Sequence, residues 1–287
     1  MSRVDVRKTH TLFIAGAFPR SESGRTYEVT DYKEQFLANM ALASRKDARD
    51  AVLAARSAVA KWSAATAYNR GQVLYRIAEV MEGRREQFIS EVSDSEGVSS
   101  RKAGAHVDAA IDRWVWYAGW ADKYAQVIGN TNPVAGPFFN FSVPEPTGVV
   151  AAVAPQDASI SGLVSVVAPI IVTGNAVIAM PSSSRPIPAI TLAECLATSD
   201  VPAGVVNILT GAPAEVMPWL AEHADVNALD LTGIVDEGVA TDLERSAAGT
   251  VKRVRGAAPH ANWQATPSLS RMRAFVEVKT VWHPMGV

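Results

Sequence analysis

The chain has 287 residues, of which 48% are hydrophobic and 20% are charged, and its net charge is −2 at pH 7. This near balance of acidic and basic side chains argues against a nucleic acid or an anionic membrane surface as the main partner. Cys195 is the only cysteine, which excludes an internal disulfide and a multi-cysteine metal site.

Two segments bear on where in the cell the protein is located: the first ten residues and the longest apolar run. Met1–His10 is polar and charged and lacks the apolar core of a signal peptide. The longest apolar run, Ile160–Val172, contains Pro169 and is too short to cross a bilayer. We therefore expect a cytoplasmic protein with no membrane partner.

The first third of the chain predicts short strands followed by helices. Thr11–Ala15 and Thr26–Thr30 suit strands on either side of a polar turn. Ser44 is placed to cap a helix, and Asp47 three residues later is close to completing a capping box. Helical spacing of apolar residues predicts further helices at about 68–82, 85–96 and 102–126.

The last of these helices carries a cluster of aromatic side chains. They could surround a ligand, but large aromatic rings more often bury their area against neighbouring helices. We expect packing for all four: Trp114, Trp116, Tyr117 and Trp120.

A segment rich in proline follows the helices. Phe138–Val143 lies between prolines, and it suits a strand or a hairpin at about 136–150 that crosses to the next unit.

From Val149 onward, short apolar runs alternate with helical segments. The candidate strands are Val149–Ala154, Ala176–Ala179, Val205–Leu209, Asn227–Leu231 and Thr250–Val254. Helices are predicted between them at about 160–172, 186–198, 214–223 and 236–247. This alternation predicts an α/β fold with a Rossmann-like, doubly wound parallel sheet. Ligands bind such sheets beyond the carboxyl ends of the strands, here the loops 154–159, 180–186, 210–214 and 232–237.

The residues after Gly256 are too few for a second domain. They predict a loop over 257–270 and a strand over Phe275–Trp282. A lone terminal strand must pair with some sheet, and the sequence leaves open whether that sheet is its own or a neighbour's.

Several short segments in a fixed order carry a family pattern. They are Leu12–Gly16, Ala41–Ser44, Glu145–Val149, Gly174–Val177, Pro202–Asn207 and Glu277–Trp282. With these segments the chain resembles the aldehyde dehydrogenase family from about residue 11 to 256, and again from 275.

The resemblance implies a division of the chain. Residues 1–256 correspond to an NAD-binding-type domain that includes the oligomerisation hairpin at 136–150, and 257–287 to a linker and an oligomerisation strand. The family's catalytic domain would stand between the two parts and is missing. The implied oligomerisation residues are Phe139, Phe141, Val143, Val276, Val278, Thr280 and Trp282.

The resemblance also implies that the chemistry is degenerate. The family's cysteine nucleophile belongs to the missing domain, and Cys195, inside a predicted helix, is expected to be a buried packing residue. Val254–Ala257, where the general-base glutamate would fall, contains no carboxylate. Asp157 stands where an asparagine would donate to the oxyanion, and an ionised carboxylate cannot donate. No catalytic residue is therefore expected.

The cofactor positions implied by the resemblance are altered too. Met180 and Ser183 replace a lysine and a glutamate that hold the adenosine ribose, Ile234 replaces a serine near the pyrophosphate, and Pro213 removes a backbone N–H. We expect no cofactor, with weak NAD(P) binding as the alternative, because helix N-termini still attract anions. The vestigial positions are Ala154, Pro155, Gln156, Met180, Pro181, Ser182, Ser183, Gly211, Gly233 and Ile234.

Other chemistry has little support. The five histidines are scattered without metal-ligand spacing, so no metal site is expected. Lys252, Arg253 and Arg255 suit a solvated sheet edge better than a phosphate clamp.

Three functions fit these observations. The preferred one is a catalytically inactive subunit that assembles, through strand pairing, with a full-length aldehyde dehydrogenase or another chain of its own type. The alternatives are an NAD(P)-dependent aldehyde oxidoreductase completed in trans by another subunit, and a weak nucleotide-binding module. The identity of the partner, its aldehyde and the stoichiometry are not encoded in any pattern of the chain.

Overall fold

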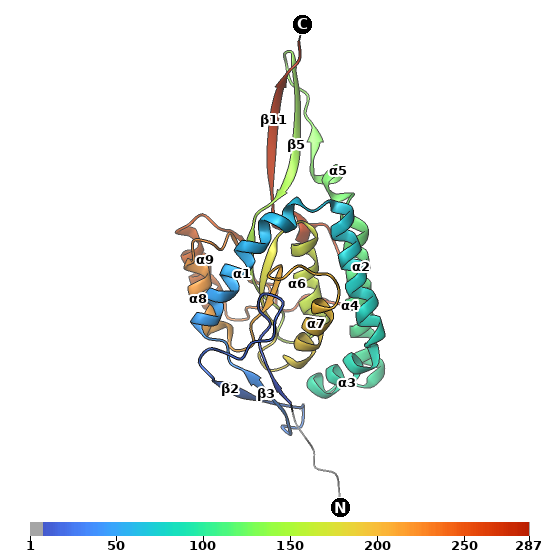
Figure 1. Cartoon of the computed structure of the whole chain (residues 1–287), viewed down its shortest axis with the longest axis vertical. Helices are drawn as coiled ribbons and strands as arrows, with labels where there is room; N and C mark the ends of the chain where they lie inside the picture. Colours follow the sequence, from blue (N-terminus) through green and yellow to red (C-terminus); the bar gives the residue numbers. More distant parts are fainter. Residues whose placement is uncertain (1–7, 287) are drawn as a thin grey trace, which may run out of the picture.

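The computed structural model describes residues 8–286, so the predicted character of Met1–Arg7 lies outside the described part. Figure 1 shows a body built around one sheet, with helices on both faces and a long ribbon projecting from one end. The sheet contains β6 (Val149–Val153), β7 (Ala176–Met180), β8 (Val206–Ile208), β9 (Ala228–Asp230) and β10 (Arg253–Arg255). Its order is β10-β9-β6-β7-β8, and every pair is parallel.

Alternate residues of β6 and β7 enter two separate cores. Val150 and Val177 lie in the core of the face covered by α6 (Ser161–Val172) and α7 (Ile187–Ala197). Val149 and Ile178 lie in the opposite core, beneath α8 (Pro213–Glu222) and α9 (Glu237–Ala248). Both faces of the sheet are thus buried, as near-continuous apolar strands require. The predicted doubly wound α/β fold is confirmed.

The N-terminal helices cover these layers. α1 (Arg45–Ala64) packs on the second core, whereas α2 (Ala67–Gly83), α3 (Arg85–Glu96) and α4 (Ser100–Trp120) pack outside α6 and α7 (Figure 1). The predicted capping box is present, because Ser44 and Asp47 exchange hydrogen bonds at the start of α1. Trp114 and Tyr117 are fully buried, which confirms that they pack against other helices.

Three predicted elements differ from the structure. The helix expected to run to residue 126 ends at Trp120, and after a turn the short α5 (Tyr124–Ile128) begins. Thr11–Ala15 is not a strand, because Ala15 and Gly16 have φ of 54° and 75° and reverse the chain. Thr250–Lys252 is a turn, in which Val251 has φ of 55°, so the last strand of the sheet starts at Arg253.

A small sheet lies at the end of the body opposite the ribbon (Figure 1). In it β3 (Phe36–Ala41) pairs in parallel with β1 (Thr9–His10) and antiparallel with β2 (Thr26–Thr30). Its middle strand is tied to the large sheet, because the Ala41 carbonyl accepts from Thr210 Oγ1 at 2.6 Å.

The ribbon, defined as β4 (Asn130–Thr131), β5 (Phe138–Pro146) and β11 (Val276–Pro284), is the third sheet. Of the strand or hairpin expected at about 136–150, the structure has the strand: β5 does not fold back on itself within this segment, and it pairs along its whole length with β11 of the same chain. Pro144 and Pro146 lie beyond the residues paired with β4, where β5 is an edge strand and tolerates proline.

The segment between the sheet and β11 packs on the body. It contains α10 (Ser270–Ala274), and Met272 and Phe275 are buried in the core beside α6. No helix among residues 8–286 is both long enough and apolar enough to cross a membrane.

Candidate functional site

In a doubly wound sheet, the ligand crevice lies where the strand order reverses, which in this sheet is between β6 and β9. The chain moves from β6 outward through β7 to β8 and then returns to the other side of β6, so the order reverses at this point. The Gly233 N–H donates to the Val153 carbonyl at 2.9 Å. A Cβ on Gly233 would lie 1.9 Å from the Ala154 carbonyl oxygen, so only glycine fits here.

Gln156 joins the loop after β6 to the loop after β7. Its Oε1 atom accepts from the N–H and the hydroxyl of Ser183, at 2.9 and 3.1 Å, and its backbone carbonyl accepts from Ser182 Oγ at 2.8 Å. The Gln156 amide donates to the Ala154 carbonyl. These predicted cofactor positions do come together, but their polar groups bind one another.

The other predicted cofactor residues do not join these contacts between the two loops. Met180 and Ile234 are 0% and 6% exposed and belong to the core beneath α8 and α9. Pro181 is buried as well. Gly211 has φ of 129°, and a Cβ on it would lie 2.8 Å from Leu42 Cδ1. Pro213 is the first residue of α8, where a missing N–H breaks no hydrogen bond of the helix. The residues present therefore fit a dinucleotide poorly.

Asp157 is exposed, and only its backbone makes a hydrogen bond with a described residue, accepting from Arg185 at 2.8 Å. An ionised carboxylate only accepts hydrogen bonds, so it cannot replace the donor that an asparagine would supply at this position.

The tail residues 257–275 supply a cluster that sequence reasoning missed. Arg271 forms an ion pair with Asp230 at the carboxyl end of β9, and it stacks on Trp263, 5.0 Å from the ring centroid. Asp230 also accepts from the N–H and hydroxyl of Thr232. Arg113 of α4 donates to the Ala265 carbonyl at 2.8 Å. The sequence did contain a signal for this cluster: Asp230 lies at the end of a buried strand, and a buried carboxylate needs a partner.

Three arginines surround Tyr117 in this cluster. Burial raises the pKa of Tyr117 to about 12, although Arg271, Arg113 and Arg255 pull it down. Tyr117 therefore stays protonated at neutral pH, and its hydroxyl faces the Ser268 carbonyl at 3.5 Å. The cluster fastens the tail across the end of the sheet.

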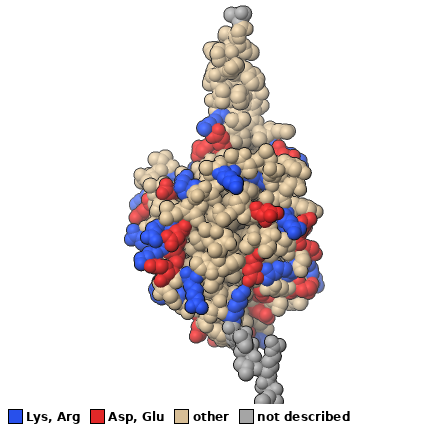
Figure 2. Space-filling model, viewed as in Figure 1, with Lys and Arg blue, Asp and Glu red and all other residues tan. Residues whose placement is uncertain are grey.

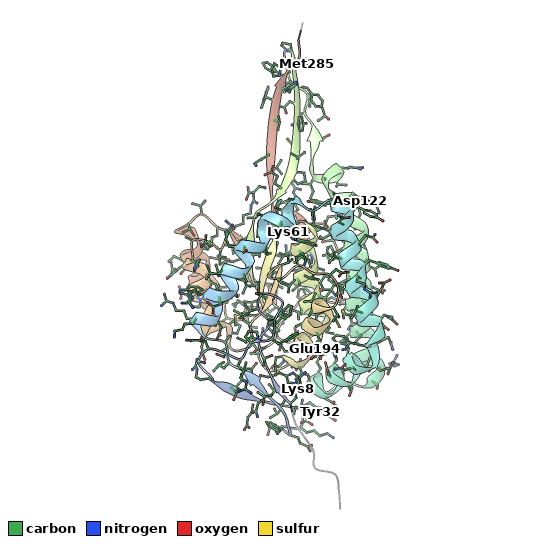
Figure 3. All side chains as sticks on the ribbon, in the orientation of Figure 1. Lys8, Tyr32, Lys61, Asp122, Glu194 and Met285 are labelled. Atoms are coloured by element: carbon green, nitrogen blue, oxygen red, sulfur yellow. The ribbon has the colours of Figure 1, made fainter. Side chains whose placement is uncertain are left out.

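Cys195 lies away from the crevice, in α7. It is fully buried, its sulfur is 4.0 Å from Arg84, and burial raises the pKa of the thiol to about 11. Figure 3 shows the neighbouring Glu194 in the lower half of the body near Lys8, with which it forms an ion pair. The expected packing role of Cys195 is confirmed.

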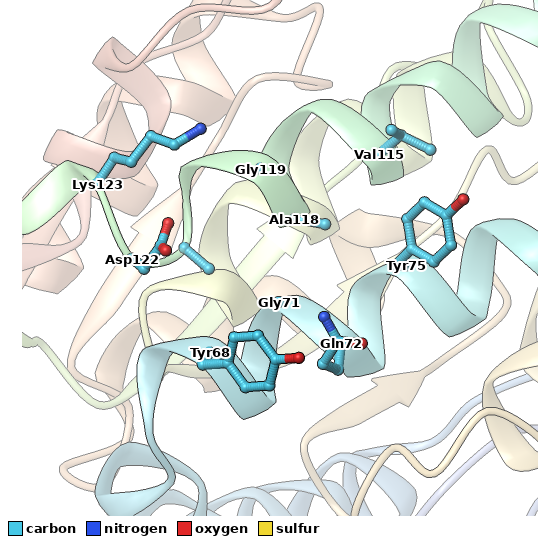
Figure 4. A pocket seen from close by; sticks show the side chains of 10 residues that line it. Tyr68, Gly71, Gln72, Tyr75, Val115, Ala118, Gly119, Asp122 and Lys123 are labelled. Atoms are coloured by element: carbon cyan, nitrogen blue, oxygen red, sulfur yellow. The ribbon is translucent and has the colours of Figure 1, made fainter.

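Among the described residues, no three His, Cys, Asp or Glu side chains are grouped so that they could hold a metal ion. Arg253 donates twice to Glu277 of β11, so the predicted basic edge is partly neutralised. A hollow of about 370 Å³ lies outside the crevice, between α2 and α4, where Tyr68 and Tyr75 flank Gln72 (Figure 4).

The ribbon carries the predicted oligomerisation residues on two opposite faces. Phe139, Phe141 and Val143 pair with His283, Val281 and Lys279 on one face. Val276, Val278, Thr280 and Trp282 lie on the other, because successive strand residues alternate. Val281 completes the first face, and the sequence reasoning had not included it.

The comparisons decide the family. The aldehyde dehydrogenase family matches residues 18–257 of this chain. The chain belongs to the aldehyde dehydrogenase family. Cytosolic 10-formyltetrahydrofolate dehydrogenase of Xenopus tropicalis is 32% identical over 262 residues, which cover 88% of this chain and 29% of that protein. D-glyceraldehyde dehydrogenase (NADP(+)) of Thermoplasma acidophilum is 28% identical over 256 residues, covering 88% and 52%.

Solved aldehyde dehydrogenases have the same fold. An NAD+ complex of the aldehyde dehydrogenase from Bacillus cereus matches with a TM-score of 0.81 and 26% identity, covering 86% of this chain and 50% of that one. HpcC from Thermus thermophilus matches with a TM-score of 0.81 and 30% identity, covering 86% and 47%. This aldehyde dehydrogenase family member thus spans about half, or less, of the length of these relatives.

Proposed function

We propose that the chain is a non-catalytic member of the aldehyde dehydrogenase family that assembles, through its ribbon, with a full-length aldehyde dehydrogenase. The observation that carries the proposal is a projecting ribbon with exposed apolar side chains, in which one edge of β11 has no strand neighbour among residues 8–286.

The surface of the ribbon is unlike the rest of the molecule. Figure 2 shows acidic and basic side chains spread over the body, whereas the ribbon beyond its base has neither. The charged side chains at the base of the ribbon are Lys279 and Glu145, which form an ion pair. Above it Phe139, Val281 and Trp282 are 45%, 40% and 58% exposed. Apolar patches of this kind mark contact surfaces for proteins.

The edge of β11 supports strand pairing as the mode of contact. β11 pairs with β5 on one side only, and within the described residues its other side has no strand neighbour. An unpaired row of N–H and C=O groups invites a strand from another chain. A ribbon standing clear of the body is only marginally stable by itself, so a partner would also stabilise it.

The non-catalytic part of the proposal rests on Cys195 and on the crevice. The one cysteine is buried with a raised pKa, which disfavours the thiolate that a nucleophile requires. The polar groups of Gln156, Ser182 and Ser183 are used by one another, and the tail crosses the end of the sheet.

The experiment is co-expression of the full chain with each full-length aldehyde dehydrogenase of the source organism, followed by native mass spectrometry. We expect a stable complex with one of them, and its loss in the Val281→Lys variant. Val251→Lys is the matched control, because Val251 is 91% exposed and lies in the turn before β10. A complex that survives Val281→Lys contradicts the ribbon as the contact surface.

Two other outcomes redirect the proposal. If the chain forms only dimers with itself, and Val281→Lys separates them, the partner is a second copy rather than a full-length enzyme. If the aldehyde-dependent reduction of NAD+ by the complex changes in the Asp157→Asn variant, the chain contributes to catalysis in trans.

A further inference from the structure

A hollow of about 220 Å³ lies at the small sheet of β1, β2 and β3. Figure 1 shows β2 and β3 at the end of the molecule opposite the ribbon. The hollow is lined by His10 at the end of β1, by Arg20 in the loop before β2, and by Arg25 and Thr26, where β2 begins. None of the crevice residues takes part. It is smaller than the roughly 300–1,000 Å³ of sites for drug-sized ligands, so it suits a small compound.

The described residues of the lining are basic or neutral, and none of them carries a carboxylate. Arg20 makes no hydrogen bond or ion pair with any described residue, so its guanidinium is available. Arg25 uses only one nitrogen on a carboxylate, in a 3.3 Å contact to Glu215 of α8. The hydroxyl of Thr26 likewise has no partner among the described residues.

The carboxylates around the hollow are already engaged. Asp47 accepts from Ser21 Oγ, the Glu22 N–H and the Ser44 N–H, at 2.7 to 2.9 Å. The Glu22 side chain pairs with Lys46 at 2.6 Å. Glu194 pairs with both Lys8 and Arg84. Among residues 8–286, therefore, Arg20 has no counter-ion at this hollow.

His10 adds a buried polar atom with no partner. Its Nδ1 is inaccessible to solvent and makes no hydrogen bond among the described residues. A buried unpaired polar atom costs free energy, and a ligand atom within reach would remove that cost. Guanidinium groups and ring nitrogens together are typical donors to phosphate oxygens.

We propose that this hollow binds the phosphate group of a small phosphorylated compound. The Arg20 guanidinium, Arg25 and the Thr26 hydroxyl donate to the phosphate oxygens. The His10 ring turns on binding, so that Nδ1, which solvent does not reach in this structure, forms its hydrogen bond with the ligand. The remaining space takes a short organic group. The proposal is independent of the assembly function above.

The test is calorimetric titration of the full chain with inorganic phosphate in a low-salt buffer free of other multivalent anions. We expect one saturable site with a dissociation constant in the low millimolar range. Arg20→Gln should weaken binding by roughly tenfold or more, the effect of losing a charge-assisted hydrogen bond. Arg245→Gln is the matched control, since Arg245 is 73% exposed on α9 and the charge change is the same. It should leave the affinity unchanged.

A second variant and two further ligands complete the design. His10→Leu, which keeps the volume and removes the ring nitrogens, should weaken phosphate by severalfold while the thermal midpoint without phosphate stays within a few degrees. Ribose 5-phosphate should bind more tightly than phosphate, and ribose should not bind. No saturable phosphate binding at about 50 mM, equal losses in Arg20→Gln and Arg245→Gln, or acetate binding as well as phosphate would each overturn the assignment.

Discussion

Arg271 of α10 and Asp230 at the end of β9 form a buried ion pair across 41 residues of sequence, with 3.3 Å between Nη1 and Oδ2. Their side chains are 11% and 1% exposed. The pair joins the tail to the edge of the sheet where the order of strands reverses. Removing one partner leaves the other charge buried without compensation, which is costly.

Arg271→Met should lower the free energy of unfolding by about 3 kcal/mol, the typical result of breaking a buried pair from one side. The Asp230→Leu, Arg271→Met double variant should recover part of that loss, because no unpaired charge remains. Urea denaturation of these two variants and of Asp230→Leu alone measures the losses. Arg245→Met, at an exposed pair with Asp242, should change stability by less than about 0.5 kcal/mol. Additive losses in the double variant would show that the two charges do not compensate each other.

Gly233→Ala should destabilise the chain by about 2 kcal/mol or more, because the new methyl group would lie 1.9 Å from the Ala154 carbonyl oxygen and force two loops apart. Gly119→Ala is the matched control. Gly119 is in α4 and a Cβ there meets nothing within 4 Å, so alanine should stabilise by about 0.5–1 kcal/mol through helix propensity. Thermal unfolding of both variants distinguishes the two effects. A Gly233→Ala protein as stable as the parent would mean that the two loops yield without cost.

Cys195 should make stability fall at high pH. Burial raises the pKa of the folded thiol from 9.0 to about 11, so the folded state holds this proton more tightly than the unfolded state. The stabilising effect is complete below pH 9 and is lost as pH rises to about 11, amounting to about 3 kcal/mol. The difference in unfolding free energy between the parent and Cys195→Val, measured across that range, isolates the thiol from other groups. A difference that is constant with pH would contradict the prediction.

NAD+ and NADP+ should bind weakly at most, with dissociation constants no tighter than about 1 mM, because Ser183 is occupied by Gln156 and Met180 lies in the core. Ser183→Glu restores the carboxylate that the family resemblance implies for the ribose, and it should tighten NAD+ binding severalfold. Calorimetric titration measures both. Micromolar binding by the parent chain would show that the crevice opens in solution.

The family relationship and the α/β fold follow from local pattern. Apolar runs such as Val149–Val153, separated by stretches with helical spacing, can be buried only between two helical layers, and this makes a parallel sheet the expected solution. Ser44 and Asp47 mark the start of α1 for an equally local reason, since both partners of a capping box lie within one turn. The burial of Cys195 is expected because a free cysteine inside a helix usually packs as a small apolar residue.

Only the tertiary structure decided where distant groups meet. No local pattern relates Arg271 to Asp230, and none reveals that Phe139 and Trp282 lie on opposite faces of the ribbon, because that depends on the pairing register of β5 and β11. Met180 and Gln156 differ likewise: one points into a core and the other joins two loops. Helices and strands arise from interactions between near neighbours along the chain. Ion pairs, strand registers and hollows arise from long-range packing, which the sequence specifies only through the whole fold.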